Sequence, residues 1–201
     1  PADRYAVHVI ADNCTDDTAT LARQYDVTVH ERFDDVNIGK GYALQWLIDK
    51  LHGDDVAHDA VVILDADTIV SPDFLHKING YMDKGARIIQ AYYSVRDPEQ
   101  SWSVGLRAAA LSVIHYLRPQ GRMVLGASAG LKGNGMVFHS DVLRTHPWSA
   151  SVTEDIEFHM QVLIDGERVI FAPDVLIEAE MPTTLDNAQT QNSRWEQGRL
   201  Q

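Results

Sequence analysis

The most informative stretch of the chain is Ala60-Val-Val-Ile-Leu64, which is followed directly by the acids of Asp65-Ala-Asp67. Five consecutive apolar residues are typical of a strand that is buried on both faces, as strands of a parallel sheet are. Strand-like and helix-like segments alternate through the first hundred residues, which indicates an α/β architecture with a mainly parallel sheet. Because open α/β sheets bind ligands at the carboxyl ends of their strands, we expect a functional site where this strand ends.

Asp65 and Asp67 are candidate metal ligands. Strand alternation points both side chains the same way, with Ala66 opposite, and two carboxylates can bind a hard divalent cation through oxygen. The pattern Asp-x-Asp is short enough to occur by chance in an acidic chain, where it would be a solvated loop or a helix cap. The buried strand before it favours the metal site.

The charge balance restricts the possible ligands. The chain has 201 residues, of which 17 are basic and 29 acidic, for a net charge of −12. A broad electrostatic contact with nucleic acid is therefore excluded. A phosphate-bearing ligand would be repelled by the overall field and would need a metal ion or a few well-placed cations. The length and the 45% hydrophobic content are those of one globular domain over residues 1–201.

Two segments near the N-terminus could also contact a ligand. The strand expected at residues 5–10 ends close to Asp12, and residues 37–41 open a helix with Gly39-Lys40-Gly41. Glycine lets the backbone approach a ligand, a helix N-terminus favours anions, and Lys40 adds a charge. The alternative is an ordinary loop with a surface lysine, since neither a P-loop nor a G-x-G-x-x-G fingerprint follows the first strand.

Two segments near the C-terminus carry further candidates. Thr153-Glu154-Asp155 precedes an apolar helix, where a threonine cap with acids in the first turn is a sufficient structural explanation. In a last helix, expected at residues 185–197, spacing places Gln191, Arg194 and Trp195 on one face. Arginine can bind a phosphate and tryptophan can stack on a sugar, although a helix with one buried tryptophan is the alternative.

No stretch of sequence predicts a membrane span or a disulfide. Cys14 is the only cysteine, which is typical of a reducing compartment. No apolar run reaches the roughly 18 residues that cross a bilayer. The nearest one, residues 104–117, belongs to a helix that we expect to end before Pro119. The chain starts at Pro1 without a methionine, which indicates a piece of a longer protein.

Taken in order, these segments resemble the family-2 glycosyltransferases, most closely the branch of cellulose, chitin and hyaluronan synthases with its three acidic motifs and Q-x-x-R-W. Residues 9–18 resemble the first motif, with Asp12 at its second acid and Ala11 in place of the first. Gly39-Lys40-Gly41-Tyr-Ala-Leu44 resembles the segment beside the nucleotide. The resemblance implies the GT-A fold, a Rossmann-like three-layer α/β/α arrangement.

The same resemblance implies a role for each site residue. Asp155 would be the catalytic base, Asp67 would bind the metal, and Asp65 would bind the metal or the ribose. The residues implied to bind the donor are Asp12, Lys40, Asp65, Asp67, Gln191, Arg194 and Trp195. Those implied to bind the acceptor are Gly133, Asn134, Glu154 and Trp195.

The implied activity is inverting, Mg²⁺- or Mn²⁺-dependent transfer from a nucleotide-sugar, a UDP-sugar, to a hydroxyl of a glycan or a lipid-linked acceptor. The full-length protein would sit on the cytoplasmic side of the cell membrane, and this chain would be a soluble fragment without the family's first strand and C-terminal membrane helices. Two alternatives stay open, a sugar-phosphate nucleotidyltransferase and a non-catalytic nucleotide-sugar-binding fragment. The Q-x-x-R-W pattern disfavours the nucleotidyltransferase.

Overall fold

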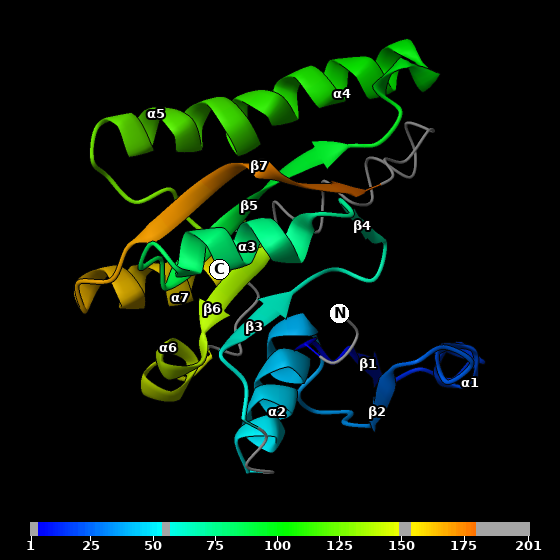
Figure 1. Cartoon of the computed structure of the whole chain (residues 1–201). Coiled ribbons are helices and arrows are strands. Elements are labelled where there is room, and N and C mark those ends of the chain that lie inside the picture. Colours follow the sequence, from blue (N-terminus) through cyan, green and yellow to red (C-terminus); the bar gives the residue numbers. More distant parts are fainter. Residues whose placement is uncertain (1–3, 54–56, 149–153, 180–201) are drawn as a thin grey trace. The chain divides into compact units, whose positions relative to one another are not determined.

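The computed structural model describes residues 4–53, 57–148 and 154–179 (Figure 1). The chain divides into two units. The small unit comprises residues 1–57 and 147–154, and the large unit comprises residues 58–146 and 155–201. The helix expected at residues 185–197 lies outside the described residues.

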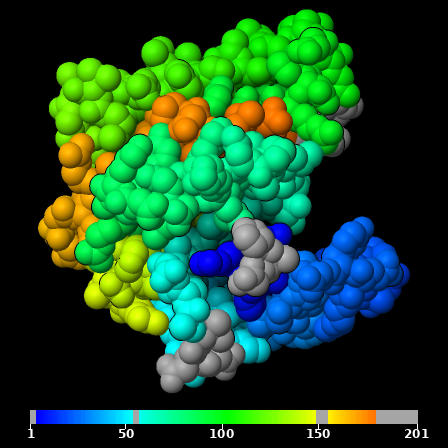
Figure 2. All heavy atoms as spheres, viewed as in Figure 1, coloured from blue at the N-terminus to red at the C-terminus, as the bar shows by residue number. Residues whose placement is uncertain are grey.

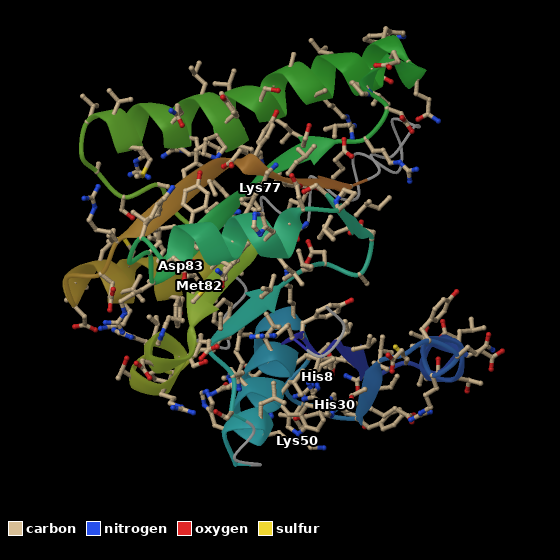
Figure 3. All side chains as sticks on the ribbon, in the orientation of Figure 1. His8, His30, Lys50, Lys77, Met82 and Asp83 are labelled. Atoms are coloured by element: carbon tan, nitrogen blue, oxygen red, sulfur yellow. The ribbon has the colours of Figure 1, made fainter. Side chains whose placement is uncertain are left out.

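The small unit is a βαβα segment. Its elements are β1 (His8–Asp12), α1 (Thr18–Ala22), β2 (Thr28–Arg32) and α2 (Lys40–Gly53). β1 and β2 pair in parallel, from His8 opposite Thr28 to Asp12 opposite Arg32. The rings of His8 on β1 and His30 on β2 stack with centroids 5.2 Å apart (Figure 3). The strand predicted at residues 5–10 is observed at His8–Asp12, so Asp12 is its last residue.

The large unit is built on a mixed sheet in the order β3-β6-β5-β7-β4. Its strands are β3 (Ala60–Ile63), β4 (Thr68–Val70), β5 (Ile88–Val95), β6 (Met136–His139) and β7 (Val169–Ala179). The α/β class is confirmed, but the expectation of a mainly parallel sheet needs correction. In this sheet only β5 and β7 pair in parallel, and the other three neighbouring pairs are antiparallel.

The path of the loop before β6 explains why β6 runs antiparallel to β5. The segment before it starts beside the first residue of β7, where the Ala129 N–H donates to the Val169 carbonyl (2.9 Å). It reaches the middle of β5 at Gly135, whose carbonyl accepts from the Ala91 N–H (2.8 Å). The chain then turns back along β5, so β6 runs against it. The alternation of helices and strands in a sequence carries no information about such a return.

β7 is continuous from Val169 to Ala179 in spite of the proline within it. The structure has one strand with a register shift, because Ala91 pairs with Ala172 whereas Tyr92 pairs with Leu176. Pro173 lies in the skipped segment. Proline has no N–H for the ladder, so a bulge at this point keeps the pairing on both sides of it.

Helices cover the sheet of the large unit. They are α3 (Phe74–Met82), the 3₁₀ turn η2 (Pro98–Gln100), α4 (Trp102–Ser112), the π turn η3 (Val113–Leu117), α5 (Arg118–Val124), α6 (Ser140–Thr145) and α7 (Glu154–Ile164). α3 buries Phe74 and Ile78 against residues of β5, β6 and β7. α4 and α5 run end to end along β5 and β7 (Figure 1).

The expectation that the helix after Trp102 ends before Pro119 is wrong. The helix continues through the π turn η3 into α5, where Pro119 is the second residue and is buried. An interior proline lacks an N–H and crowds the carbonyl of the preceding turn. A wider π turn directly before it relieves both conflicts, so the chain stays helical.

Among residues 4–53, 57–148 and 154–179, no helix is both long and apolar enough to cross a bilayer.

Candidate functional site

The two acids that follow β3 lie on a closed turn. The Thr68 N–H donates to the Asp65 carbonyl (3.1 Å), and β4 starts at Thr68. Asp65 is half-buried and Asp67 is exposed. Both carboxylates act on one neighbour: burial, together with the charges of Asp67 and Asp65, raises the pKa of Tyr93 to about 12. The two acids and the Tyr93 hydroxyl therefore share one electrostatic environment.

The side chain of Asn134, which is distant from this turn in the sequence, binds the turn. Its side chain is almost fully buried, with 2% of the residue exposed. Its Oδ1 accepts from the Asp65 N–H (3.1 Å), and its Nδ2 donates to the Thr68 Oγ1 (2.9 Å). One carboxamide thus binds both ends of the turn that carries the acids, and it fixes the backbone of that turn.

Gln90 holds Asn134 in turn. It is 1% exposed on β5, and its Nε2 donates to the Asn134 carbonyl (2.8 Å) and to the Ala91 carbonyl (3.0 Å). A buried polar group is costly unless it is paired, so two bonds from one amide indicate a fixed backbone at this point. The loop before β6 is therefore anchored to the centre of the sheet.

Asp155 meets the same loop at Gly133. Gly133 has a φ of +77°, and a Cβ built on it would lie 3.5 Å from the Asp155 Oδ2. The backbone of the loop thus lies directly against the carboxylate. Asp155 is the second residue of α7, and its Oδ1 accepts from the Ile156 N–H (2.9 Å).

These contacts place three of the predicted motifs in one part of the large unit. The Asp65 N–H binds Asn134, the preceding residue Gly133 lies beside the Asp155 carboxylate, and 90 positions of sequence separate the two acids. The carboxylate expected to act as a base therefore lies beside the same loop that binds the turn carrying Asp65 and Asp67.

Sequence reasoning missed the aromatic neighbours of this cluster. The rings of Tyr93 and His115 meet edge to face with centroids 5.0 Å apart. Burial, followed by the charge of Lys132, lowers the pKa of His115 to about 4, so this imidazole is neutral at pH 7. Gln90 had a detectable signal, because it is the one polar residue in Ile88-Ile-Gln90-Ala91. Tyr93 and His115 had none, since their pairing depends on the packing of η3 against β5.

The donor set fits a shared metal site. Within the described ranges, no group of three His, Cys, Asp or Glu side chains could hold a metal ion. Mg²⁺ usually takes one or two carboxylates and completes its coordination with water and substrate phosphates. Asp65 and Asp67 supply that number of carboxylates, so the residues present suit a cation that is shared with a diphosphate.

In the small unit, Asp12 is bound by a buried arginine. Its Oδ1 lies 2.6 Å from the Arg32 Nη1, and the Arg32 side chain is 7% exposed. The Arg32 Nη2 contacts the Asp34 Oδ2 (2.9 Å) and donates to the Asn37 carbonyl (2.8 Å). The backbone N–H of Asn37 is the main cause of the lowered pKa of Asp34. Arg32 thus joins Asp12 to the loop that leads into α2.

The other predicted residues are placed as follows. Lys40 is the first residue of α2 and follows Gly39, whose φ of +132° only glycine adopts readily. Glu154 is the first residue of α7. Gln191, Arg194 and Trp195 lie outside the described residues.

Curated relatives match the chain over much of its length. A β-monoglucosyldiacylglycerol synthase of Synechocystis is 26% identical over 100% of this chain and 42% of its own length. A glucomannan 4-β-mannosyltransferase of rice, described as probable, is 24% identical over 97% of this chain and 37% of its own length. The chain thus spans about two fifths of these relatives.

Solved structures show the same fold. The mannosyltransferase PcManGT of Pyrobaculum calidifontis, in complex with GDP-Man and Mn²⁺, superposes with a TM-score of 0.65 at 20% identity, over 94% of this chain and 51% of that chain. Glucosyl-3-phosphoglycerate synthase of Mycobacterium tuberculosis gives 0.59 at 19% identity, over 94% and 67%. These likenesses confirm the predicted GT-A fold.

A family model, that of glycosyl transferase family group 2, matches residues 60–201. The match starts at the first residue of β3, runs through both acids of the turn and Asp155, and covers most of the chain. The chain therefore belongs to family 2 of the glycosyltransferases.

Proposed function

We propose that this chain is the catalytic part of an inverting, metal-dependent glycosyltransferase that moves a sugar from a nucleoside diphosphate to a hydroxyl group. The observation that carries the proposal is the chain of contacts from Asp65 through Asn134 and Gly133 to Asp155. It supports a base and a diphosphate site in one part of the large unit. A single displacement needs that arrangement, because a proton leaves the acceptor while a diphosphate leaves the donor.

In the proposed reaction, the Asp155 carboxylate accepts the proton of the acceptor hydroxyl. The hydroxyl oxygen then forms a bond to the anomeric carbon, and the bond from that carbon to the diphosphate oxygen breaks. The electron pair of the broken bond leaves with the nucleoside diphosphate. For the proton transfer, the Asp155 oxygen must come within about 2.6–3.2 Å of the hydroxyl oxygen in the reactive complex.

The role proposed for Asp65 and Asp67 is to hold Mg²⁺ or Mn²⁺. When bound, such an ion neutralises charge on the leaving diphosphate. Asn134 keeps both carboxylates in place before the donor arrives, so little reorganisation is needed during the reaction. The overall charge of −12 makes this arrangement necessary, because the chain otherwise repels a diphosphate.

Lys40 and Arg194 are proposed to add positive charge at the donor. Asp12 is proposed to contact the nucleotide base of the donor. Gln191 and Trp195 are proposed to cover the diphosphate and the acceptor sugar. Gly133, Asn134 and Glu154 are proposed to line the acceptor site. Asn134 would combine that role with its bonds to the metal-binding turn.

For the substrates, we propose a glucose or mannose donor carried on UDP or GDP. The names of the two curated relatives describe β-linked glucosyl and mannosyl products, one on diacylglycerol and one on a glucomannan. Inversion at an α-linked nucleotide sugar yields a β linkage, which agrees with the proposed single displacement. The proposed acceptor is accordingly a hydroxyl of a lipid or of a glycan, and the full-length protein is proposed to work at the cytoplasmic side of a membrane.

The test is a screen of UDP- and GDP-sugars with Mn²⁺, scored by release of nucleoside diphosphate. Asp155→Asn should abolish release and leave donor binding by calorimetry intact, while Glu157→Gln, also on α7, should behave like the unchanged protein. Normal turnover by Asp155→Asn would show that Asp155 is not the base. Pyrophosphate release from a nucleoside triphosphate and a sugar phosphate would indicate a nucleotidyltransferase, and binding without turnover would indicate a non-catalytic module.

A further inference from the structure

The outer side of the helix formed by α4, η3 and α5 is unusually apolar. Its six most exposed apolar side chains are between 53% and 85% accessible; they are Trp102, Leu106, Val113, Leu117, Val124 and Leu125. The first five are spaced four or seven residues apart, so they form one stripe along a helix of about 35 Å, and Leu125 directly follows its last residue. We call these six residues the outer stripe. A contiguous apolar surface of this kind marks a contact with a partner or a membrane.

The opposite side of the same helix is already used for folding. Val104 is 1% exposed and packs with Val95 of β5. The Tyr116 ring meets the rings of Tyr92 and Phe171, with centroids 4.9 Å and 5.8 Å away. The outer stripe is therefore distinct from the side of the helix that packs against the sheet. The helix is held to the sheet by one side and presents the other, as the space-filling view shows along the edge formed by α4 and α5 (Figure 2).

The charges within the helix that carries the outer stripe are opposite in sign to the net charge of the chain, and the nearest acids before it are the exposed Asp97 and Glu99. No acidic residue lies between Glu99 and Asp141, although the chain has 29 of them. The charged residues of the helix itself are Arg107, Arg118 and Arg122, and Arg118 is exposed. The charges of the helix are thus all positive in a chain whose net charge is −12.

From these observations we propose that the outer stripe lies on the surface of a bilayer that contains anionic phospholipid. Apolar side chains enter the acyl boundary, and flanking arginines reach the phosphates of the headgroups. Charges are screened beyond about 8–10 Å at physiological salt, so only the local positive charge acts at contact. The acidic remainder of the chain is repelled by the same surface, which favours contact through this helix alone.

A second copy of the chain fits the outer stripe less well than a bilayer does. A symmetric contact places the same face on both sides, so arginines would meet arginines with no acid on the helix to pair with them. α7 provides a useful contrast. It also exposes an apolar stripe, in which Ile164 is 74% accessible, but the acids Glu157 and Asp165 accompany it. The proposal therefore predicts that α7 does not bind anionic lipid.

The test is co-sedimentation of the whole 201-residue chain with vesicles. Vesicles of phosphatidylcholine are compared with vesicles that contain about one third phosphatidylglycerol. Binding to the anionic vesicles should be stronger and should fall with salt. Leu106→Glu/Leu117→Glu should lower it by more than about tenfold. Ile164→Glu on α7 is the matched control and should bind like the unchanged protein.

The arginines give a second, independent readout. Arg107→Gln/Arg118→Gln should weaken binding to the anionic vesicles by about fivefold for each arginine and should leave binding to phosphatidylcholine unchanged. Circular dichroism melting verifies that the exchanged surface residues leave the fold intact.

Trp102 reports on the place of contact, because it belongs to the outer stripe. Brominated lipid should quench part of the tryptophan emission in the unchanged protein, and this part should be absent in Trp102→Phe. The proposal is overturned if the anionic vesicles do not bind the protein or if Ile164→Glu weakens binding as much as the stripe variant does. It is equally overturned if Leu106→Glu/Leu117→Glu acts only by dissolving a dimer seen in light scattering. None of these readouts involves sugar transfer, so failure here is distinct from failure of the proposed reaction.

Discussion

Removing the Asn134 carboxamide should loosen the turn that carries Asp65 and Asp67. In Asn134→Ala, the Asp65 N–H loses its acceptor at 3.1 Å and the Thr68 hydroxyl loses its donor at 2.9 Å. The site is buried, so a backbone N–H without a partner costs about 1–3 kcal/mol. The hydroxyl can rotate to another partner, and the gap left by the carboxamide adds about 1 kcal/mol. We expect the free energy of unfolding of the large unit to fall by about 2–4 kcal/mol.

The effect on metal binding should be as large. Groups that orient metal ligands typically change affinity about 10–100-fold when they are removed. Calorimetry of Mn²⁺ with UDP or GDP present measures this change, and urea unfolding measures the stability. Asn79→Ala is the matched control, because the Asn79 Nδ2 donates to the Asp83 Oδ2 (2.8 Å) at an exposed position of α3. It should cost less than about 0.5 kcal/mol and leave metal affinity unchanged.

The reasoning fails if Asn134→Ala binds Mn²⁺ as tightly as the unchanged protein. In that case the turn would hold its shape without the carboxamide, and the acids would be positioned by their own backbone. A loss of stability with full metal affinity would mean that Asn134 matters for folding alone.

Three further changes test other parts of the structure. Gly135→Ala should destabilise the large unit by about 2–4 kcal/mol in urea, because the position has a φ of +66° and an added Cβ would overlap a methyl group on β7. Gly80→Ala, in a helix with open space around it, should instead be neutral or stabilising. Arg32→Gln should cost about 3 kcal/mol in thermal unfolding, since it leaves Asp12 without its buried partner; stability equal to that of the unchanged protein would contradict this. The pKa of His115 is lowered to about 4 in the folded chain, so the unfolded chain binds a proton more readily. The free energy of unfolding should therefore fall by up to about 3 kcal/mol as the pH drops from about 6.5 to 4. Urea unfolding at both ends of this pH range should show a smaller fall for His115→Gln.

Much of the site could be predicted from local pattern. A short apolar run followed by two acids predicts a buried strand with carboxylates at its end, and β3 with Asp65 and Asp67 has that form. Acids at the start of an apolar helix predict the position of Asp155 on α7. These features depend on residues next to one another, so the sequence is sufficient to find them. Their order along the chain also carries the family resemblance, which the match over residues 60–201 confirms.

Local pattern failed where the direction of the chain or a wide turn mattered. The helix continues through Pro119 because the π turn η3 accommodates the missing N–H. Residue preferences do not predict such a turn. The antiparallel entry of β6 depends on how the preceding loop returns along β5. Both outcomes result from packing against the sheet rather than from neighbours in sequence.

The amino-acid sequence alone therefore determined the α/β class, the acids at the end of β3 and the charge deficit that calls for a cation. The folded chain was needed to show that Asn134 binds the Asp65 turn, that Gly133 lies beside Asp155 and that one side of α4 and α5 is exposed. The two kinds of feature differ in how far apart in the sequence the interacting residues are. Propensity and periodicity act over a few residues, whereas hydrogen bonds between positions 69 residues apart and the burial of one helix side exist only once the sheet has assembled.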